Sequence, residues 1–483
     1  MSTESKVSEI TAAIVDTIAA ISTPPGRGGI GIVRLSGPQA ASIAVQLVRL
    51  RHPMEHTRAR VAEVLDEDLN DERIDEAMVT YFASPNSYTG DELVEIAAHG
   101  SPVVLDLLLR RALALGARLA NPGEFTERAF LAGKLDLTQA EAVRDLIEAQ
   151  TLTQARQAAS QMGGALSRRV APTKQSLIEL IALLEAGIDF AEDDVDVTSQ
   201  AEIARRIDGL TPPLAALEVS FSRGRIVHDG LTMAIVGRPN AGKSSLFNRL
   251  VERDRAIVTA TPGTTRDLVT ERISLDGIPL ELVDTAGLRE TFEEVEQLGI
   301  ARSREALADA AIVLVVLDAT QALNQEERSV LAAVHGRPAL VAINKSDLAD
   351  GSQNCGPLEG DSHQNGGVVQ QIRLTAEELA VPSVPTSALT GDGIVALRAK
   401  IVALATGGAA AEPGLLTNLR QQQSIVAARI ALEDARHANE SAIPHEMILL
   451  DLYRALWALD SLTGQTTPDD ILNLIFTTFC IGK

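Results

Sequence analysis

The chain has 483 residues, and its 65 Asp and Glu against 43 Lys and Arg give a formal net charge of −22 at pH 7. This acidity argues against tight, unaided binding to nucleic acid, since phosphate contacts need clustered Lys and Arg. No apolar run approaches the ~20 residues of a membrane span, and two cysteines cannot form a disulfide framework. We expect about three domains, at roughly 150 residues each, in a cytoplasmic protein with no membrane segment.

Residues 1–133 are predicted to form a mixed α+β domain. The strand candidates are residues 30–35, 78–82 and 92–97, and helical apolar spacing follows over residues 102–115. Arg34, Glu95 and Lys134 stand in or beside these apolar segments. Taken alone, each is more simply a surface charge than a ligand contact.

The pattern becomes helical from Leu137, and residues 134–228 are predicted to begin an all-α domain. Residues 229–406 alternate strand and helix, which is typical of a parallel α/β sheet. Helical spacing resumes over residues 407–483. We therefore predict a nucleotide domain inserted into one discontinuous helical domain, with a loop over residues 351–367. The acidic run 192–196 lacks the spacing of a calcium loop and indicates a solvated connection.

The most informative stretch is the apolar run that stops at Gly237 and is followed by a G-x-x-x-x-G-K-S loop and a helical pattern. In this context the glycines let backbone N–H groups surround phosphate oxygens at a helix N-terminus. Lys243 would reach the β- and γ-phosphates, and the Ser244 hydroxyl would bind Mg²⁺. The stretch predicts a nucleoside triphosphate site.

The base is indicated by Asn344-Lys-Ser-Asp347, which ends a second buried strand. The Asp347 carboxylate can accept both N–H donors of the guanine edge, which adenine cannot supply. Asn344 would complete the recognition, and Lys345 would lie over the base plane. Ser387 and Ala388 lie in a weaker match to the loop whose backbone contacts the guanine carbonyl. These features together predict a GTPase.

The sequence also contains residues that are predicted to contact the γ-phosphate and its metal ion. Asp284 would reach Mg²⁺ through water, the Gly287 N–H would contact the γ-phosphate, and residues 263–267 would supply a second metal hydroxyl. Asp276-Gly277 is the turn signal of a β-hairpin. Small GTPases place a glutamine where this chain has Leu288, which cannot hydrogen-bond. Another residue must therefore orient the attacking water.

Further motifs point to one family. They are Asp16-Thr-Ile-Ala-Ala, Thr23-Pro-Pro-Gly-Arg-Gly-Gly, Arg34-Leu-Ser-Gly, Asn121-Pro-Gly-Glu-Phe-Thr-Glu-Arg-Ala-Phe, Lys134-Leu-Asp-Leu-Thr-Gln-Ala-Glu-Ala and the final Phe479-Cys-Ile-Gly-Lys483. In this order and around a GTPase core, they resemble the MnmE (TrmE) family of tRNA modification GTPases over essentially the full length.

The resemblance implies a multidomain fold of α/β and all-α parts: a P-loop GTPase domain inserted in a discontinuous helical domain, with an α+β N-terminal domain that binds folate and dimerises. It implies folate contacts at Arg34, Glu95, Lys134 and Lys483, which reverses the surface-charge interpretation of the first three. Arg and Lys would suit the carboxylates of a folate tail, and Glu would suit the pterin N–H edge.

For the GTPase domain the resemblance implies hydrolysis that depends on potassium and on pairing of two such domains. Glu296 would orient water through a bridging water, Lys243 would act on the phosphates, and Arg289 would assist at the domain contact. The implied metal ligands are Ser244 and Thr265 for Mg²⁺, and Asn240, Thr259, Thr261 and Thr264 for K⁺. The implied GTP contacts are Lys243, the six metal ligands just named, and Ala241, Gly242, Ser245, Ala260, Pro262, Gly263, Asp284, Thr285, Ala286, Gly287, Asn344, Lys345, Asp347, Ser387 and Ala388.

The implied reaction is addition of a carboxymethylaminomethyl or aminomethyl group at carbon 5 of the tRNA wobble uridine. A tetrahydrofolate derivative, 5,10-methylene or 5-formyl, would be the cofactor, and a homodimer would join an FAD-containing MnmG (GidA)-type protein in a heterotetramer. Cys480 is open to two interpretations, a nucleophile or a small packing residue. The alternative class is a ribosome-assembly GTPase of the Era or EngA kind, which predicts a KH-like RNA-binding domain.

Overall fold

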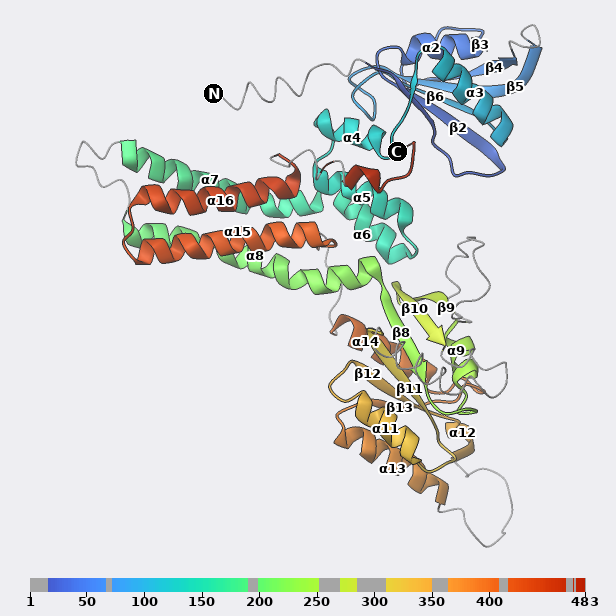
Figure 1. Ribbon diagram of the computed structural model, residues 1–483, viewed down its shortest axis with the longest axis vertical. Helices are drawn as coiled ribbons and strands as arrows, with labels where there is room; N and C mark the ends of the chain where they lie inside the picture. The colour runs from blue at the N-terminus through green and yellow to red at the C-terminus, as the bar shows by residue number, and fades with distance from the viewer. Residues whose placement is uncertain are drawn as a thin grey trace, which may run out of the picture. The chain divides into compact units, whose positions relative to one another are not determined.

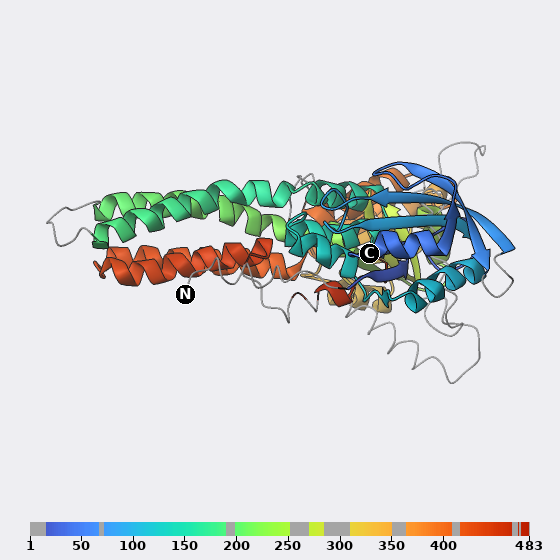
Figure 2. The same ribbon diagram turned by 90° about the horizontal axis from the view of Figure 1, so that it is seen from above.

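The computed structural model describes residues 16–66, 72–189, 199–251, 270–284, 310–349, 364–407, 416–465, 472 and 475–482. Figure 1 labels its helices and strands, and Figure 2 gives a second view. Tertiary contacts divide the chain into two units. One spans Met1–Arg144, Gln161–Leu210 and Ala427–Lys483, and the other spans Asp145–Ser160 and Thr211–Val426. The units are thus assembled from segments far apart in the sequence.

The N-terminal part of the first unit is built on a seven-stranded sheet with the order β3-β4-β5-β6-β2-β1-β7. Its strands are β1 (Ile18–Ile21), β2 (Gly28–Ser36), β3 (Val48–Leu50), β4 (Ala59–Asp66), β5 (Glu72–Phe82), β6 (Leu93–Gly100) and β7 (Arg118–Leu119). Helices α2 (Ala40–Leu47) and α3 (Pro102–Ala114) bury their apolar residues against the sheet (Figure 1). The three predicted strands and the predicted helix are confirmed. β5 begins six residues before its predicted start, because pairing with β4 rather than apolar composition holds that polar half.

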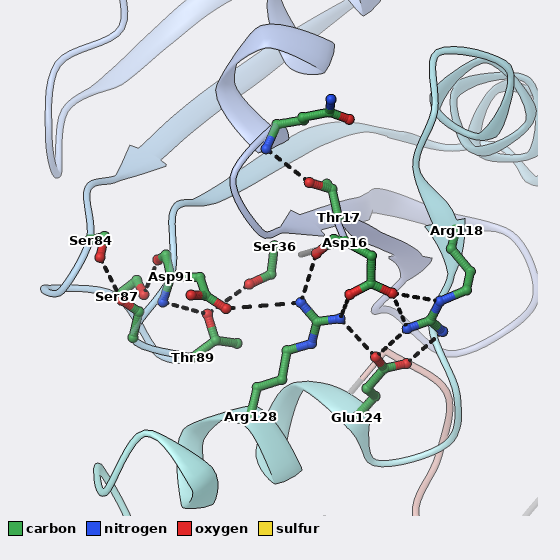
Figure 3. A network of polar contacts seen from close by, with 12 residues as sticks. Asp16, Thr17, Ser36, Ser84, Ser87, Thr89, Asp91, Arg118, Glu124 and Arg128 are labelled. Carbon is green, nitrogen blue, oxygen red and sulfur yellow. Dashed lines mark hydrogen bonds and ion pairs between the residues drawn. The ribbon is translucent and has the colours of Figure 1, made fainter. Parts of the chain in front are cut away.

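A partly buried ionic network fixes helix α4 (Glu124–Leu131) to the start of the sheet (Figure 3). The Arg128 guanidinium is 4% exposed and donates to Asp16 at 2.8 Å and to Glu124 at 2.9 Å. Arg118 pairs with the same two carboxylates at 2.7 Å. Burial opposes the charged form of Glu124, but hydrogen bonds from Arg118, the Asn121 N–H and Arg128 outweigh it and keep its pKa below the ordinary value. Removing one partner from such a group costs roughly 3–5 kcal/mol, so the entry of α4 is rigid.

The C-terminal segment 475–482 returns to this same place. The Gly123 N–H donates to the Cys480 carbonyl at 3.4 Å, and Pro122 forms a β-bridge with Ile481. Gly123 has a φ of 72°, and a Cβ there would lie 2.6 Å from the Phe476 carbonyl oxygen. A glycine is therefore required where the tail crosses the start of α4.

Helices from both sides of the nucleotide domain combine in the bundle of the first unit. The helices that flank this domain in the sequence are α5 (Leu137–Glu148), α6 (Leu152–Met162), α7 (Ala165–Asp189), α8 (Gln200–Asp229), α15 (Leu419–Glu440) and α16 (His445–Thr463). Of these, α7 and α16 lie wholly in the first unit, α6 lies almost wholly in the second, and the others are divided between the two. α7 lies beside α16 in both views (Figures 1 and 2). α8 is joined to α15 by the Arg436–Asp208 ion pair at 2.8 Å and by the Asn439 amide, which donates to the Gln200 carbonyl. This confirms the predicted insertion. No helix among the described residues has the length and apolarity needed to cross a membrane.

The nucleotide domain is a six-stranded sheet with the order β13-β12-β11-β8-β10-β9, parallel except for β9. Its strands are β8 (Leu231–Val236), β9 (Thr270–Leu275), β10 (Ile278–Asp284), β11 (Ile312–Asp318), β12 (Ala339–Asn344) and β13 (Ser383–Pro385). One face packs against α9 (Lys243–Val251) and α14 (Ile394–Thr406), and the other packs against α11 (Gln325–Ala333) and α13 (Gln364–Glu378). A short α12 (Ser346–Ala349) follows β12.

Two local predictions can be compared with this domain. The hairpin turn is confirmed, because Asp276 and Gly277 have φ values of 50° and 88° and join β9 to β10. The loop predicted over residues 351–367 is too long at its end, because α13 begins at Gln364. Ile372 and Ala376 of that helix are buried against the sheet. The helix begins in a stretch that contains Gly366 and Gly367, which are poor helix formers.

The connection between α5 and α6 groups with the nucleotide domain rather than with the bundle. The Thr151 hydroxyl donates to the Gly277 carbonyl at the hairpin tip at 2.7 Å, and the Gln154 amide donates to the His228 carbonyl at 2.7 Å. The His228 ring lies 3.2 Å from the Asp145 carboxylate. Its hydrogen bond with Asp145 is the main cause that raises the His228 pKa to about 9. The domain boundaries at residues 134, 229 and 407 remain predictions.

The His228–Asp145 contact predicts a pH-dependent stability. Folding raises the pKa of His228 from 6.5 to about 9, so the contribution of the pair is complete below about pH 6.5 and is lost as the pH rises through about 9. We expect His228→Gln to destabilise the protein by roughly 2 kcal/mol at the low end of this window and by little at its high end. Thermal unfolding of both proteins across the window measures this, and a difference that does not change with pH would contradict it.

Candidate functional site

The phosphate-binding loop has the backbone that its sequence predicts. Asn240 and Gly242 have φ values of 63° and 91°, and α9 begins directly afterwards at Lys243. The Lys243 ammonium donates to the carbonyls of Gly237 at 2.8 Å and Arg238 at 2.9 Å, so its charge lies within the curve of the loop. A cation inside a backbone turn at a helix N-terminus is suited to bind phosphate.

Asn344 connects this loop to the base side of the site. It ends β12 and is 2% exposed. Its Nδ2 donates to the Ala241 carbonyl at 2.9 Å, and its Oδ1 accepts from the Ala388 N–H at 3.0 Å. A Cβ on Gly242 would lie 2.1 Å from the same Nδ2. One side chain therefore sets the spacing between the phosphate loop and the loop predicted to read the guanine carbonyl.

The side chain of Lys345 is held by a residue that sequence reasoning missed. Lys345 has a φ of 61°, and its ammonium lies 2.7 Å from the carboxylate of Asp318 at the end of β11. Asp318 also accepts hydrogen bonds from the backbone and hydroxyl of Thr320. Burial opposes its charged form, but the bonds from Lys345 and Thr320 outweigh burial and keep the pKa of Asp318 below its ordinary value. A strand that ends in Asp, followed by Thr two residues later, was the available signal.

The predicted base-reading residues lie together. Asp347 is in α12, and the N–H of the preceding Ser346 donates to the Thr386 carbonyl at 3.0 Å. Ser387 is fully buried, and its hydroxyl accepts from the Thr390 N–H at 3.1 Å. The structure thus brings residues 344–347 and 386–388 to one edge of the sheet, at the carboxyl ends of β12 and β13. Such edges of parallel sheets are where ligands bind.

The metal and γ-phosphate residues are only partly described. Ser244 is exposed in the first turn of α9, and Asp284 ends β10 opposite Ile235 of β8, so both backbones lie near the phosphate loop. A hydroxyl and a strand-end carboxylate are suitable donors for Mg²⁺. The remaining predicted residues lie outside the described residues: Thr259, Ala260, Thr261, Pro262, Gly263, Thr264, Thr265, Thr285, Ala286, Gly287, Leu288, Arg289 and Glu296. Their roles remain predictions.

A second cluster lies on the N-terminal sheet. Arg34 of β2 and Glu95 of β6 are direct antiparallel partners, and the guanidinium bonds one carboxylate oxygen at 2.7 and 3.0 Å. Arg34 also donates to the Gly482 carbonyl at 3.3 Å and lies 5.5 Å from the centre of the Phe125 ring. The phenol of Tyr88 contacts the Thr126 hydroxyl at 3.0 Å, and burial raises its pKa. The Arg34 guanidinium therefore contacts the Glu95 carboxylate, the Phe125 ring and the Gly482 carbonyl.

The other predicted residues of this cluster are less constrained. Lys134 donates to the Pro85 carbonyl, in the turn between β5 and β6. Cys480 is exposed, and its backbone carbonyl binds Gly123. Lys483 lies outside the described residues. Sequence reasoning missed the Gly482 carbonyl and the Phe125 ring, although both stand in motifs that it singled out.

Two protein-family models match this chain, and both belong to the same family. The family model described as the MnmE helical domain matches residues 137–480, and the one described as GTP-binding protein TrmE N-terminus matches residues 17–134. The tRNA modification GTPase MnmE of Koribacter versatilis (strain Ellin345) is 55% identical over 473 residues, 97% of this chain and 99% of that protein. Proteins of the same name from Nitrosomonas europaea and Symbiobacterium thermophilum are each 42% identical, over 97% of this chain and 99% of theirs.

The contact between Gly242 and Asn344 predicts a strong effect of one methyl group. Gly242→Ala would place a carbon 2.1 Å from Asn344 Nδ2 and break both hydrogen bonds of that amide. At about 1.4 kcal/mol for each bond, we expect GDP affinity to fall roughly a hundredfold. Titration with a fluorescent GDP measures it. Gly336→Ala is the matched control, because Gly336 also has a positive φ but open space around it; equal losses in the two variants would refute the steric argument.

Proposed function

This chain belongs to the MnmE family of tRNA modification GTPases, and we propose that it is a potassium-dependent GTP hydrolase that modifies the wobble uridine of tRNA. The nucleotide half of this proposal rests on the Asn344 amide. It joins the phosphate loop to the loop at residues 386–389, called here the base-side loop. The chain is a GTP hydrolase, and its relatives are named for tRNA modification over nearly their full length.

Guanine selectivity is assigned to Asp347. Its carboxylate would accept the two N–H donors of the guanine edge, and the Lys345 stem, held by Asp318, would cover the base plane. Adenine offers no such pair of donors, so it would leave a carboxylate unpaired, at a cost of roughly 1–3 kcal/mol or more.

Leu288 occupies the position of the water-orienting glutamine of small GTPases, so another residue must orient the attacking water. We assign water orientation to Glu296, assistance at the domain contact to Arg289, and Mg²⁺ ligation to Ser244 and Thr265. Potassium would supply positive charge between the phosphates, where charge develops in phosphoryl transfer. Asn240 supports this assignment, because its left-handed backbone places it at the turn of the phosphate loop. Thr259, Thr261 and Thr264 would complete the potassium site.

The tetrahydrofolate derivative is assigned to the cluster at Arg34, Glu95, Lys134 and Lys483. The chemistry of the cluster fits such a molecule, because the Arg34 guanidinium suits carboxylates and the Glu95 carboxylate suits ring N–H donors. When bound, the cofactor would supply the one-carbon unit for addition at carbon 5 of uridine. These residues would hold and orient it.

The partners belong to the same proposal. A net charge of −22 favours a division of labour in which a more basic partner holds most of the tRNA. We assign this to an FAD-containing MnmG-type protein, in a heterotetramer with a homodimer of this chain in the cytoplasm. The alternative, a ribosome-assembly GTPase of the Era or EngA kind, needs a KH-like domain. The described residues after position 407 form helices α15 and α16 and a short tail instead.

Potassium dependence is the first test. We expect GTP turnover by the full chain to be at least about tenfold higher in KCl than in NaCl at equal ionic strength, because one removed charge-stabilising contact costs that or more. Asn240→Ala should lose most of this activation while retaining Mg²⁺–GDP binding. Turnover is measured by phosphate release, and equal rates in the two salts would exclude the potassium mechanism.

Folate binding is the second test. Calorimetry should show 5-formyl-tetrahydrofolate binding to the full chain, and Arg34→Met should weaken it by about tenfold or more through loss of a charge-assisted contact. Arg110→Met is the control, since Arg110 is an exposed residue of α3 paired with Asp106. Absence of binding to the unmodified chain would remove the N-terminal assignment without affecting the GTPase.

A further inference from the structure

Arg249 bridges helix α9 to the base-side loop. Its Nε donates to the Ala388 carbonyl at 3.1 Å, and its Nη2 donates to the Leu389 carbonyl at 2.7 Å. The residues lie 139 and 140 positions apart, and the arginine is half-buried. α9 begins at Lys243, so one helix carries the phosphate-binding ammonium at its start and this guanidinium in its last turn.

The bridge determines the orientation of two consecutive peptide planes. The C=O and N–H of a trans peptide point in opposite directions. Because the carbonyls of Ala388 and Leu389 face Arg249, the N–H groups of Leu389 and Thr390 face away from it. The Thr390 N–H is used inside the loop, by the Ser387 hydroxyl. Among the described residues, the Leu389 N–H has no hydrogen-bond partner.

A second side chain, Asn344, also holds this loop. The Ala388 N–H donates to Asn344 Oδ1, whose amide also holds the Ala241 carbonyl in the phosphate loop. The loop at residues 386–389 is thus held between Asn344 and Arg249. A guanidinium is suited to this task, because its donors are fixed in one plane and can hold two carbonyls at once.

We propose that Arg249 is a specificity-determining positioning residue, which aims the Leu389 N–H at the carbonyl on carbon 6 of guanine. The inference rests on the guanine site proposed above and adds to it. Adenine carries an amino group at carbon 6, so an N–H aimed there would face another donor. Arg249 then acts through the loop and touches neither the base nor the reacting phosphates.

The test compares GDP with 6-thio-GDP, which keeps the N–H donors read by Asp347 but replaces the carbonyl oxygen by a weaker sulfur acceptor. In the full chain, Arg249→Met should weaken GDP about tenfold, the equivalent of one hydrogen bond, and should weaken 6-thio-GDP much less. Arg249→Lys, which keeps the charge but not the planar fork, should fall between. Arg328→Met, on the exposed face of α11, is the control and should change neither.

The outcomes separate the possible failures. Equal losses for the two nucleotides would overturn the proposal, because Arg249 would then support the whole site. Unchanged GDP affinity in Arg249→Met, or in Arg249→Lys if the methionine variant does not fold, would show that the bridge does not position the loop. An unmodified chain that binds ADP as well as GDP would refute the guanine site itself, which is a different result.

Discussion

One buried amide determines the geometry of the nucleotide site. Asn344 ends a strand that is buried along its whole length, and its two polar atoms face two different loops. A buried amide left half-paired would cost roughly 1–3 kcal/mol, so both loops are held at a fixed separation. The glycine at 242 follows from the same constraint, because a side chain there would occupy the position of the amide. The phosphate loop and the loop at residues 386–389 are therefore parts of one rigid arrangement.

The N-terminal cluster depends on a comparable constraint at a longer range. The antiparallel register of β2 and β6 places Arg34 opposite Glu95, and the tail adds the Gly482 carbonyl from 448 residues away. The Asp16–Arg128 network fixes the start of α4, where Gly123 receives that tail. The cluster is complete only when the C-terminal tail packs beside the β2–β6 pair. The chemistry of the cluster thus depends on the position of the C-terminal tail, which supplies the Gly482 carbonyl.

Local signals predicted much of this structure, and long-range contacts account for what they missed. The phosphate loop, the hairpin turn at Asp276-Gly277 and helix α3 follow from glycine, proline and apolar spacing over a few residues. The polar half of β5 depends on pairing with β4 instead. Asp318 and Arg249 escaped notice because their partners, Lys345 and the carbonyls of Ala388 and Leu389, lie 27 to 140 residues away.

The sequence by itself determined the order of the parts, the phosphate loop, the guanine-type motif and the family. These are carried by short patterns whose backbone requirements are local, such as the positive φ of Gly242. Only the tertiary structure decided which charges meet: Lys345 with Asp318, Arg34 with Glu95, and Arg249 with two carbonyls of the base-side loop. The physical reason is that strand register and helix packing, which sequence spacing does not encode, set the distances between residues far apart in the chain.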